Sequence, residues 1–234
     1  MWIKICGITR GEDALAAMQA KVSAIGFNCF PDSKRFIPAE QAANIAGMLR
    51  DTAAAQPELH LPEFIGVFVN ASTDTILQTV QDVGLTGVQF HGDETPEQIL
   101  ACMQQLPGIK CIRALRVSAD RVADCLAAVS ALQRLIRPDA VLLDAFVPGQ
   151  YGGTGRTVDP SVPAAWRLAP RPPLVLAGGL TPENVARAIT ATSPAGVDTA
   201  SGVESSPGIK DAAKIRSFVQ EAKRAFTASS QNRR

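Results

Sequence analysis

The sequence lacks the features that direct a chain to nucleic acid, to a membrane or to a disulfide framework. Its formal net charge is +1, so no excess of one sign favours nucleic acid or a membrane surface as a partner. No apolar run approaches the roughly 18 residues of a membrane span, and the first residues, MWIKICGIT, do not resemble a signal peptide. The five cysteines lack CxxC spacing, which argues against structural zinc and predicts reduced thiols in a cytoplasmic protein.

What the sequence does contain is a regular alternation of short apolar runs and helical patterns over 234 residues. The expected strands lie at 3–6, 24–27, 64–68, 87–90, 110–114, 141–144, 174–177 and 197–199. The expected helices lie at 12–21, 39–50, 73–83, 96–105, 119–131, 162–168, 182–190 and 210–226. Strands that alternate with helices predict right-handed crossovers and a parallel sheet.

Eight such units predict an α/β protein with a single (β/α)8 TIM barrel over residues 1–226. A doubly wound open sheet is the alternative, but the count of eight and the lack of GxGxxG after the first strand argue against it. The polar residues 227–234 are expected to form a frayed, disordered tail.

Three helix starts carry capping residues. Thr9 with Glu12, and Thr95 with Gln98, have the spacing of a capping box, and Thr181 precedes a proline and an acid. All three follow strands, so they lie on the C-terminal face of the barrel, where barrel enzymes keep their chemistry.

The strand at 141–144 ends in an acid and leads into a glycine-rich loop. Asp144 closes the apolar run, and the glycines that follow are Gly149, Gly152, Gly153 and Gly155. Glycines let a backbone turn its N–H groups toward an anion, phosphate above all. An acid beside such a loop is typical of a phosphosugar enzyme; an aspartate that only caps a turn is the alternative.

Two more loops of small residues follow the last two strands. Gly178 and Gly179 come after 174–177, and Ser201 and Gly202 come after 197–199. Barrel enzymes bind phosphate in these two loops, often at the N-terminus of a short extra helix. The loops therefore predict a phosphate site, with glycines that serve only as turns as the alternative.

Cys6 ends the first strand as Asp144 ends the sixth. Side chains alternate along a strand, so Lys4 and Cys6 face the same way. A lysine that points into a barrel is costly without a partner, and it would favour the thiolate of Cys6. A cysteine that is simply buried is the alternative.

His91 and Arg35 complete the candidate set. Gln89 and His91 share a face at the end of the fourth strand, where a histidine is either a proton carrier or a satisfied polar residue. Arg35 follows the second strand, where an arginine can clamp a carboxylate with two hydrogen bonds or remain a solvated charge.

Six segments resemble, in the same order, the phosphoribosylanthranilate isomerase family of the tryptophan pathway. They are KICGIT at 4–9, QFHGDE at 89–94, LLD at 142–144, GGTG at 152–155, LAGGLTPENV at 176–185 and GVDTASGVE at 196–204. The resemblance runs from residue 2 to about residue 222. It implies a (β/α)8 barrel that needs no metal or organic cofactor. It also implies a phosphorylated small-molecule substrate, N-(5-phosphoribosyl)anthranilate, converted by an Amadori rearrangement in a monomer or homodimer.

The resemblance also implies roles. Cys6 matches the general base, Asp144 the general acid, and Arg35 the arginine that meets the anthranilate carboxylate. The family often has Ser-Pro-Arg where this chain has Ser-Lys-Arg at 33–35, which leaves the direction of Arg35 open. The other expected substrate-binding residues are His91, in a supporting role without proton transfer, and Asp198.

Two other functions stay open on the sequence alone. One is the related histidine-pathway isomerase, which resembles a two-phosphate design with paired aspartates; here the first strand ends in Cys6 instead. The other is a barrel that binds a phosphorylated ligand without turnover, which a turnover assay separates from an enzyme.

Overall fold

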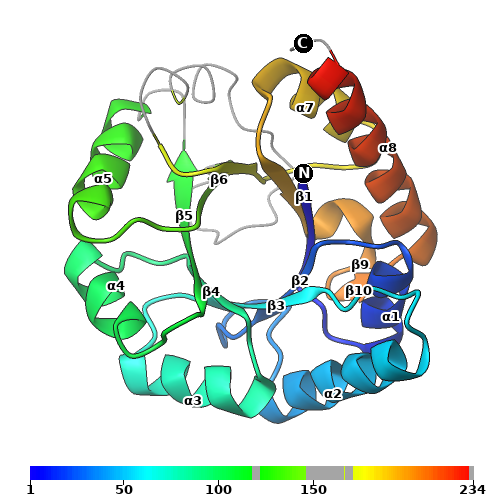
Figure 1. The fold of residues 1–234 in the computed structure, drawn as a ribbon, viewed down its shortest axis with the longest axis horizontal. Helices are drawn as coiled ribbons and strands as arrows, with labels where there is room; N and C mark the ends of the chain where they lie inside the picture. The colour runs from blue at the N-terminus through cyan, green and yellow to red at the C-terminus, as the bar shows by residue number, and fades with distance from the viewer. Residues whose placement is uncertain (118–121, 146–165, 167–170, 232–234) are drawn as a thin grey trace.

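The computed structural model describes residues 1–117, 122–145, 166 and 171–231. In these residues eight parallel strands close into a barrel in chain order, and helices surround it (Figure 1). The strands are β1 (Trp2–Cys6), β2 (Ala24–Asn28), β3 (Glu63–Phe68), β4 (Gly87–Phe90), β5 (Lys110–Val117), β6 (Ala140–Ala145), β7 (Leu174–Leu176) and β8 (Gly196–Thr199). The helices are α1 (Gly11–Gln19), α2 (Ala39–Ala55), α3 (Thr73–Val83), α4 (Pro96–Met103), α5 (Val122–Leu135), α7 (Val185–Thr192) and α8 (Ala212–Gln231). The predicted single (β/α)8 TIM barrel is confirmed.

The strand register determines which side chains meet at the barrel mouth. β1 pairs with β2 and β8, so Lys4 lies opposite Ala24 on one side and Asp198 on the other. Cys6 lies opposite Gly26, where an added Cβ would come within 2.8 Å of the Cys6 sulfur. Because all the strands are parallel, their last residues gather at one end, where the site can form.

Two layers of apolar packing hold the barrel together. The outer layer lies between strands and helices and includes Phe27, Phe64 and Phe218, each at most 1% exposed. The inner layer fills the barrel with Ala24, Ile65, Ile112, Ala114, Leu142, Val175 and Ala177. A filled barrel interior confines chemistry to the mouth.

One of the three predicted helix caps is confirmed. Thr95 forms the capping box with Gln98: its hydroxyl accepts from the Gln98 N–H, and the Gln98 side-chain oxygen accepts from the Thr95 N–H at 2.8 Å. The Thr9 prediction is wrong, because the N-cap of α1 is Arg10. The Thr9 hydroxyl instead donates to the Gly208 carbonyl at 2.6 Å, so a distant loop takes the group that would have capped the helix.

The Thr181 cap is also wrong, since α7 begins at Val185 with Asn184 as its N-cap residue. The Asn184 side chain accepts a hydrogen bond from the Thr181 N–H at 2.8 Å and donates to the Gly179 carbonyl at 2.9 Å. Asn184 thus holds the turn after β7 rather than capping the helix.

The segment after β8 departs most from the prediction. A 3₁₀ turn, η2 (Ser201–Val203), leads into a small hairpin of β9 (Glu204–Ser206) and β10 (Ile209–Lys210), which the sequence did not predict, and α8 begins at Ala212 rather than at residue 210. α8 then continues to Gln231, past the expected boundary at residue 226, so the predicted tail is helical to that point. The reason is that adding residues to the end of an existing helix costs far less than starting one, so the polar residues 227–231 extend the helix that the preceding residues form.

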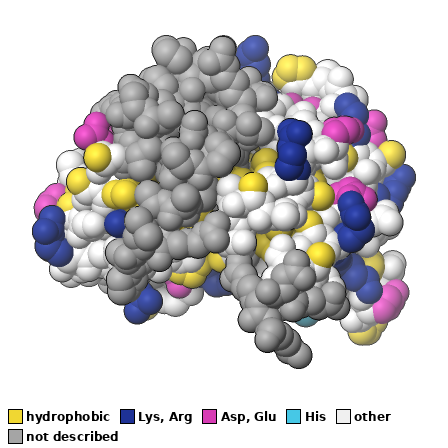
Figure 2. Space-filling view, turned by 90° about the horizontal axis from the view of Figure 1, so that it is seen from above, with side chains coloured by type: hydrophobic (Ala, Val, Ile, Leu, Met, Phe, Trp, Pro, Cys, Tyr) yellow, Lys and Arg dark blue, Asp and Glu magenta, His cyan; other side chains and the backbone are white. Residues whose placement is uncertain are grey.

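Two predicted features lie wholly or mostly outside the described residues. Of the predicted helix at 162–168, the structure describes only Trp166, which is helical and buried. The glycines of the loop after β6, Gly153 and Gly155 among them, lie outside the described residues. Among the helices of the described residues, none is long and apolar enough to cross a membrane. Figure 2 shows basic and acidic side chains interspersed over the described part of one face.

Candidate active site

A cleft at the C-terminal mouth of the barrel gathers most of the predicted residues. The predicted residues that line it are Cys6, Arg35, His91, Asp144, Gly178, Gly179, Asp198 and Ser201. They come from six segments that lie far apart in sequence, at or just after the ends of β1, β2, β4, β6, β7 and β8. Gly202 does not line the cleft, and Gly153 and Gly155 lie outside the described residues.

Lys4 and Asp198 form a buried ion pair on the floor of this cleft. The Lys4 ammonium is fully buried and donates to Asp198 Oδ1 at 2.9 Å. Burial acts to lower the pKa of Lys4, but the Asp198 carboxylate, with a smaller contribution from Cys6, outweighs it and raises that pKa. Lys4 therefore keeps its charge, and Asp198 has a structural partner besides any ligand.

The Cys6 thiol lies beside this pair and is itself buried, with 8% of the residue exposed. Burial raises the pKa of Cys6 above its ordinary value of 9.0, and the neighbouring Lys4 lowers it by less. The predicted influence of Lys4 thus has the expected sign, but burial outweighs it. In the free barrel Cys6 is a thiol at neutral pH.

Asp144 and His91 lie side by side in the cleft. His91 Nε2 lies 3.5 Å from Asp144 Oδ2, longer than a good hydrogen bond, and Gln89 Nε2 lies 3.0 Å from His91 Nδ1. When the Gln89 amide nitrogen donates, Nδ1 is the acceptor and the imidazole proton sits on Nε2, toward Asp144. Among the described residues, Gln89 Oε1, His91 Nε2 and Asp144 Oδ1 are buried without a hydrogen-bond partner. These atoms can therefore bond a ligand.

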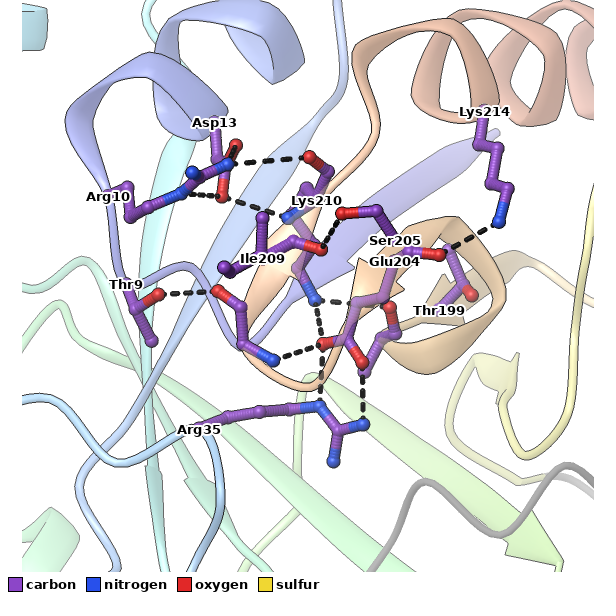
Figure 3. Close-up of polar contacts among 12 residues, drawn as sticks. Thr9, Arg10, Asp13, Arg35, Thr199, Glu204, Ser205, Ile209, Lys210 and Lys214 are labelled. Carbon is purple, nitrogen blue, oxygen red and sulfur yellow. Dashed lines mark hydrogen bonds and ion pairs between the residues drawn. The ribbon is translucent and has the colours of Figure 1, made fainter.

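Arg35 is already engaged by another residue. Its Nε and Nη2 donate to the two carboxylate oxygens of Glu204 at 2.7 and 2.8 Å (Figure 3). Glu204 also accepts from Lys210 Nζ at 2.8 Å. Sequence reasoning missed both residues; the available signal was an acid in the small-residue segment directly after β8, followed by a lysine.

The loops after β7 and β8 form the predicted phosphate end. Gly178 and Gly179 have φ of +79° and +60°, in the left-handed region that favours glycine. Neither N–H donates a hydrogen bond to another described residue, so both are available to an anion. The two loops are joined by the Thr199 hydroxyl, which donates to the Leu180 carbonyl at 2.7 Å.

Gly202 contributes to this end by its lack of a side chain. An added Cβ would lie 1.8 Å from the Leu180 carbonyl oxygen and 2.8 Å from the Thr199 hydroxyl. The loop after β8 can therefore pack on the loop after β7 only with glycine at this position.

The chain matches the model of the N-(5′-phosphoribosyl)anthranilate isomerase family over residues 3–221. A relative of that name from Myxococcus xanthus is 45% identical, and the match covers 94% of this chain and 95% of the relative.

Two solved structures show the same similarity. Monomers made from the dimeric isomerase of Thermotoga maritima are 34% identical with a TM-score of 0.76, and the match covers 95% of this chain and 98% of that one. A phosphoribosylanthranilate isomerase in complex with reduced 1-(o-carboxyphenylamino)-1-deoxyribulose 5-phosphate is 35% identical with a TM-score of 0.76 and the same coverage. The chain therefore belongs to the N-(5′-phosphoribosyl)anthranilate isomerase family and is an isomerase of tryptophan biosynthesis.

Proposed function

We propose that Cys6 and Asp144 are the base and the acid of the Amadori rearrangement. The observation that carries the proposal is their placement: β1 and β6 lie on different sides of the closed barrel, and both residues line one cleft. A sugar held between them would meet the thiol on one side and the carboxyl on the other. Each such group typically contributes about 10²–10⁴-fold to a rate.

The steps divide between the two residues as follows. The Asp144 carboxyl gives its proton to the furanose ring oxygen as the C1′–O bond breaks, and the anilino nitrogen lone pair forms a C1′=N bond. The Cys6 thiolate then takes the C2′ proton, the electrons of that C–H bond form C1′=C2′, and the π electrons of C1′=N return to the nitrogen. Protonation at C1′ and loss of the hydroxyl proton at C2′ give the aminoketose.

The base role requires the thiolate, which burial of Cys6 opposes. The charged Lys4 beside it stabilises the thiolate once the proton has left. The active fraction of the free enzyme should therefore grow as the pH rises.

The remaining residues hold the two ends of the substrate. Gly178, Gly179 and Ser201 would bind the phosphate through backbone N–H groups, with Gly202 keeping their loops together. Gly153 and Gly155 are proposed for the same end on the sequence pattern alone. At the other end Arg35 would meet the anthranilate carboxylate; His91 and Asp198 would contact the sugar between them.

The rearrangement needs no redox partner, and we propose that it proceeds without metal or organic cofactor in the cytoplasm. The solved structure of monomers made from a dimeric relative supports a monomer or homodimer of this chain. Light scattering of the purified protein measures which form is present.

The direct test is turnover of phosphoribosylanthranilate by the purified chain, followed as loss of substrate fluorescence. Cys6→Ala and Asp144→Asn are measured alongside, with circular dichroism to establish folding. Wild-type turnover with both variants slowed by at least about 10²-fold supports the assignment. Near wild-type kcat in Cys6→Ala would refute the base role.

A further inference from the structure

Arg35 is held by a carboxylate from the far end of the chain (Figure 3). Glu204 lies 169 residues away in sequence and accepts two parallel hydrogen bonds, from Arg35 Nε and Nη2. The two side chains are 14% and 5% exposed, so water competes little for the contact. A bidentate pair fixes both the place and the plane of a guanidinium. It therefore sets the direction of the remaining nitrogen, Nη1, which bonds no described residue.

Glu204 is itself anchored by its hairpin. Lys210 Nζ donates to Glu204 Oε1 at 2.8 Å and to the Ala200 carbonyl at 3.1 Å, and the Gly208 N–H donates to the same Oε1 at 3.3 Å. Burial opposes the charge on Glu204, but Arg35 and Lys210 outweigh it and lower the pKa of the carboxyl. Glu204 is thus an ionised partner at neutral pH that three other residues hold by hydrogen bonds.

A second constraint acts on the stem of Arg35. Gly7 directly follows Cys6 and has φ of +71°, and an added Cβ there would lie 2.6 Å from Arg35 Cδ. The arginine stem therefore lies against the backbone beside the catalytic thiol, where only glycine leaves room. With its stem against Gly7 and its head on Glu204, Arg35 has one orientation in the cleft.

We propose that Glu204 is a positioning residue that presents the free edge of Arg35 to the substrate carboxylate. The inference rests on the proposed contact between Arg35 and that carboxylate. Glu204 offsets part of the charge of Arg35, so it adds no attraction of its own. It supplies orientation, because a side chain already fixed loses little freedom when the ligand binds. Glu204 should therefore govern how strongly the enzyme prefers a ligand with the carboxylate.

The test compares two ligands. One is reduced 1-(o-carboxyphenylamino)-1-deoxyribulose 5-phosphate, and the other is the same molecule without the carboxyl group. The ratio of their dissociation constants, measured by calorimetry, is the carboxylate preference. The phosphate end is common to both ligands and cancels in the ratio.

The main variant is Glu204→Gln with Lys210→Met, which removes one charge of each sign and keeps the sum. Its carboxylate preference should fall roughly tenfold, the effect of one weakened charge-assisted hydrogen bond. Glu204→Asp, which keeps the charge on a shorter arm, should lose less. In an Arg35→Ala background the same Glu204 change should alter the preference by less than about twofold, because the two residues act as one unit.

The matched control is Glu94→Gln. Glu94 is a buried carboxylate paired with Arg113 at 2.6 Å on the same end of the barrel, but it does not line the cleft. This variant should lose stability while its carboxylate preference stays at the wild-type value.

Several outcomes would overturn the inference. If the Glu204 variants bind both ligands more weakly by the same factor, Glu204 is a structural residue only. A preference that is kept, or that rises because Arg35 gains free charge, would show that orientation is not what Glu204 supplies. If Arg35→Ala keeps the wild-type carboxylate preference, the inference about Glu204 fails. Turnover of phosphoribosylanthranilate by the wild type would still support the proposed function. If wild type does not turn it over, the proposed function itself has failed.

Discussion

Replacing Gly202 by alanine should loosen the phosphate end of the site. The added methyl would lie 1.8 Å from the Leu180 carbonyl oxygen, a backbone atom that cannot rotate away. The loops after β7 and β8 must then separate by more than about an ångström for ordinary contact to return. The Thr199 hydroxyl, which joins these loops through Leu180, would be pushed out of its 2.7 Å hydrogen bond.

The size of the effect follows from these contacts. Overpacking of this kind costs about 1–3 kcal/mol of stability. For a chain of this length that corresponds to a fall of about 2–12 °C in Tm. One misplaced charge-assisted hydrogen bond to phosphate costs about 1.5–3 kcal/mol, or roughly 10- to 150-fold in affinity.

The assay measures Tm by calorimetry and the dissociation constants of the aminoketose product with and without its phosphate. Gly202→Ala should bind the phosphorylated ligand more weakly and the dephosphorylated ligand about as well as wild type. The matched control is Gly47→Ala, inside α2, where an added Cβ meets nothing within 4 Å. That change should stabilise the protein by about 0.5–1 kcal/mol and leave both affinities unchanged. If Gly202→Ala weakens both ligands equally, the phosphate assignment is wrong.

Three more predictions concern the reacting groups. Burial raises the pKa of Cys6, so kcat/KM and the rate of Cys6 alkylation should both rise as the pH increases toward and above 9. The free energy of unfolding should fall over the same range, because the folded state holds the Cys6 proton more tightly than the unfolded state does. His91→Asn should keep measurable activity while Asp144→Asn loses about 10²–10⁴-fold in kcat; an equally deep loss would make His91 a proton carrier. Asp198→Asn removes a charge that raises the pKa of Cys6, so the pH–rate profile should move to lower pH; a raised KM with an unmoved profile would instead assign Asp198 to substrate binding alone.

The fold and half of the site could be predicted because they depend on local pattern. Apolar runs of strand length that end in Cys6, His91 or Asp144 place those residues at the barrel mouth whatever the loops do. Glycine pairs after the seventh strand need positive φ, and Gly178 and Gly179 have it. The Thr95 capping box needs only residues three apart, and it forms.

Features that depend on distant partners could not be predicted. The local sequence predicts that the Thr9 hydroxyl caps α1, but this hydroxyl donates a hydrogen bond to the carbonyl of Gly208, 199 residues away. The hairpin of β9 and β10 has no strong alternation of its own, and ion pairs to Arg35 and Lys210 organise it. A charge pattern does not reveal which of many arginines a glutamate will meet.

The pKa of Cys6 depends partly on local sequence and partly on residues that are distant in the chain. Alternation along β1 places Lys4 beneath it, and that much of the electrostatics is local. The net direction of the pKa shift depends on how deeply the closed barrel buries the sulfur and on Asp198, which arrives from β8 and takes part of the charge of Lys4. The sequence therefore predicts that Lys4 lowers the pKa of Cys6, because both side chains lie on one face of the strand. The protonation state of Cys6 depends in addition on burial and on Asp198, which only the closed barrel supplies.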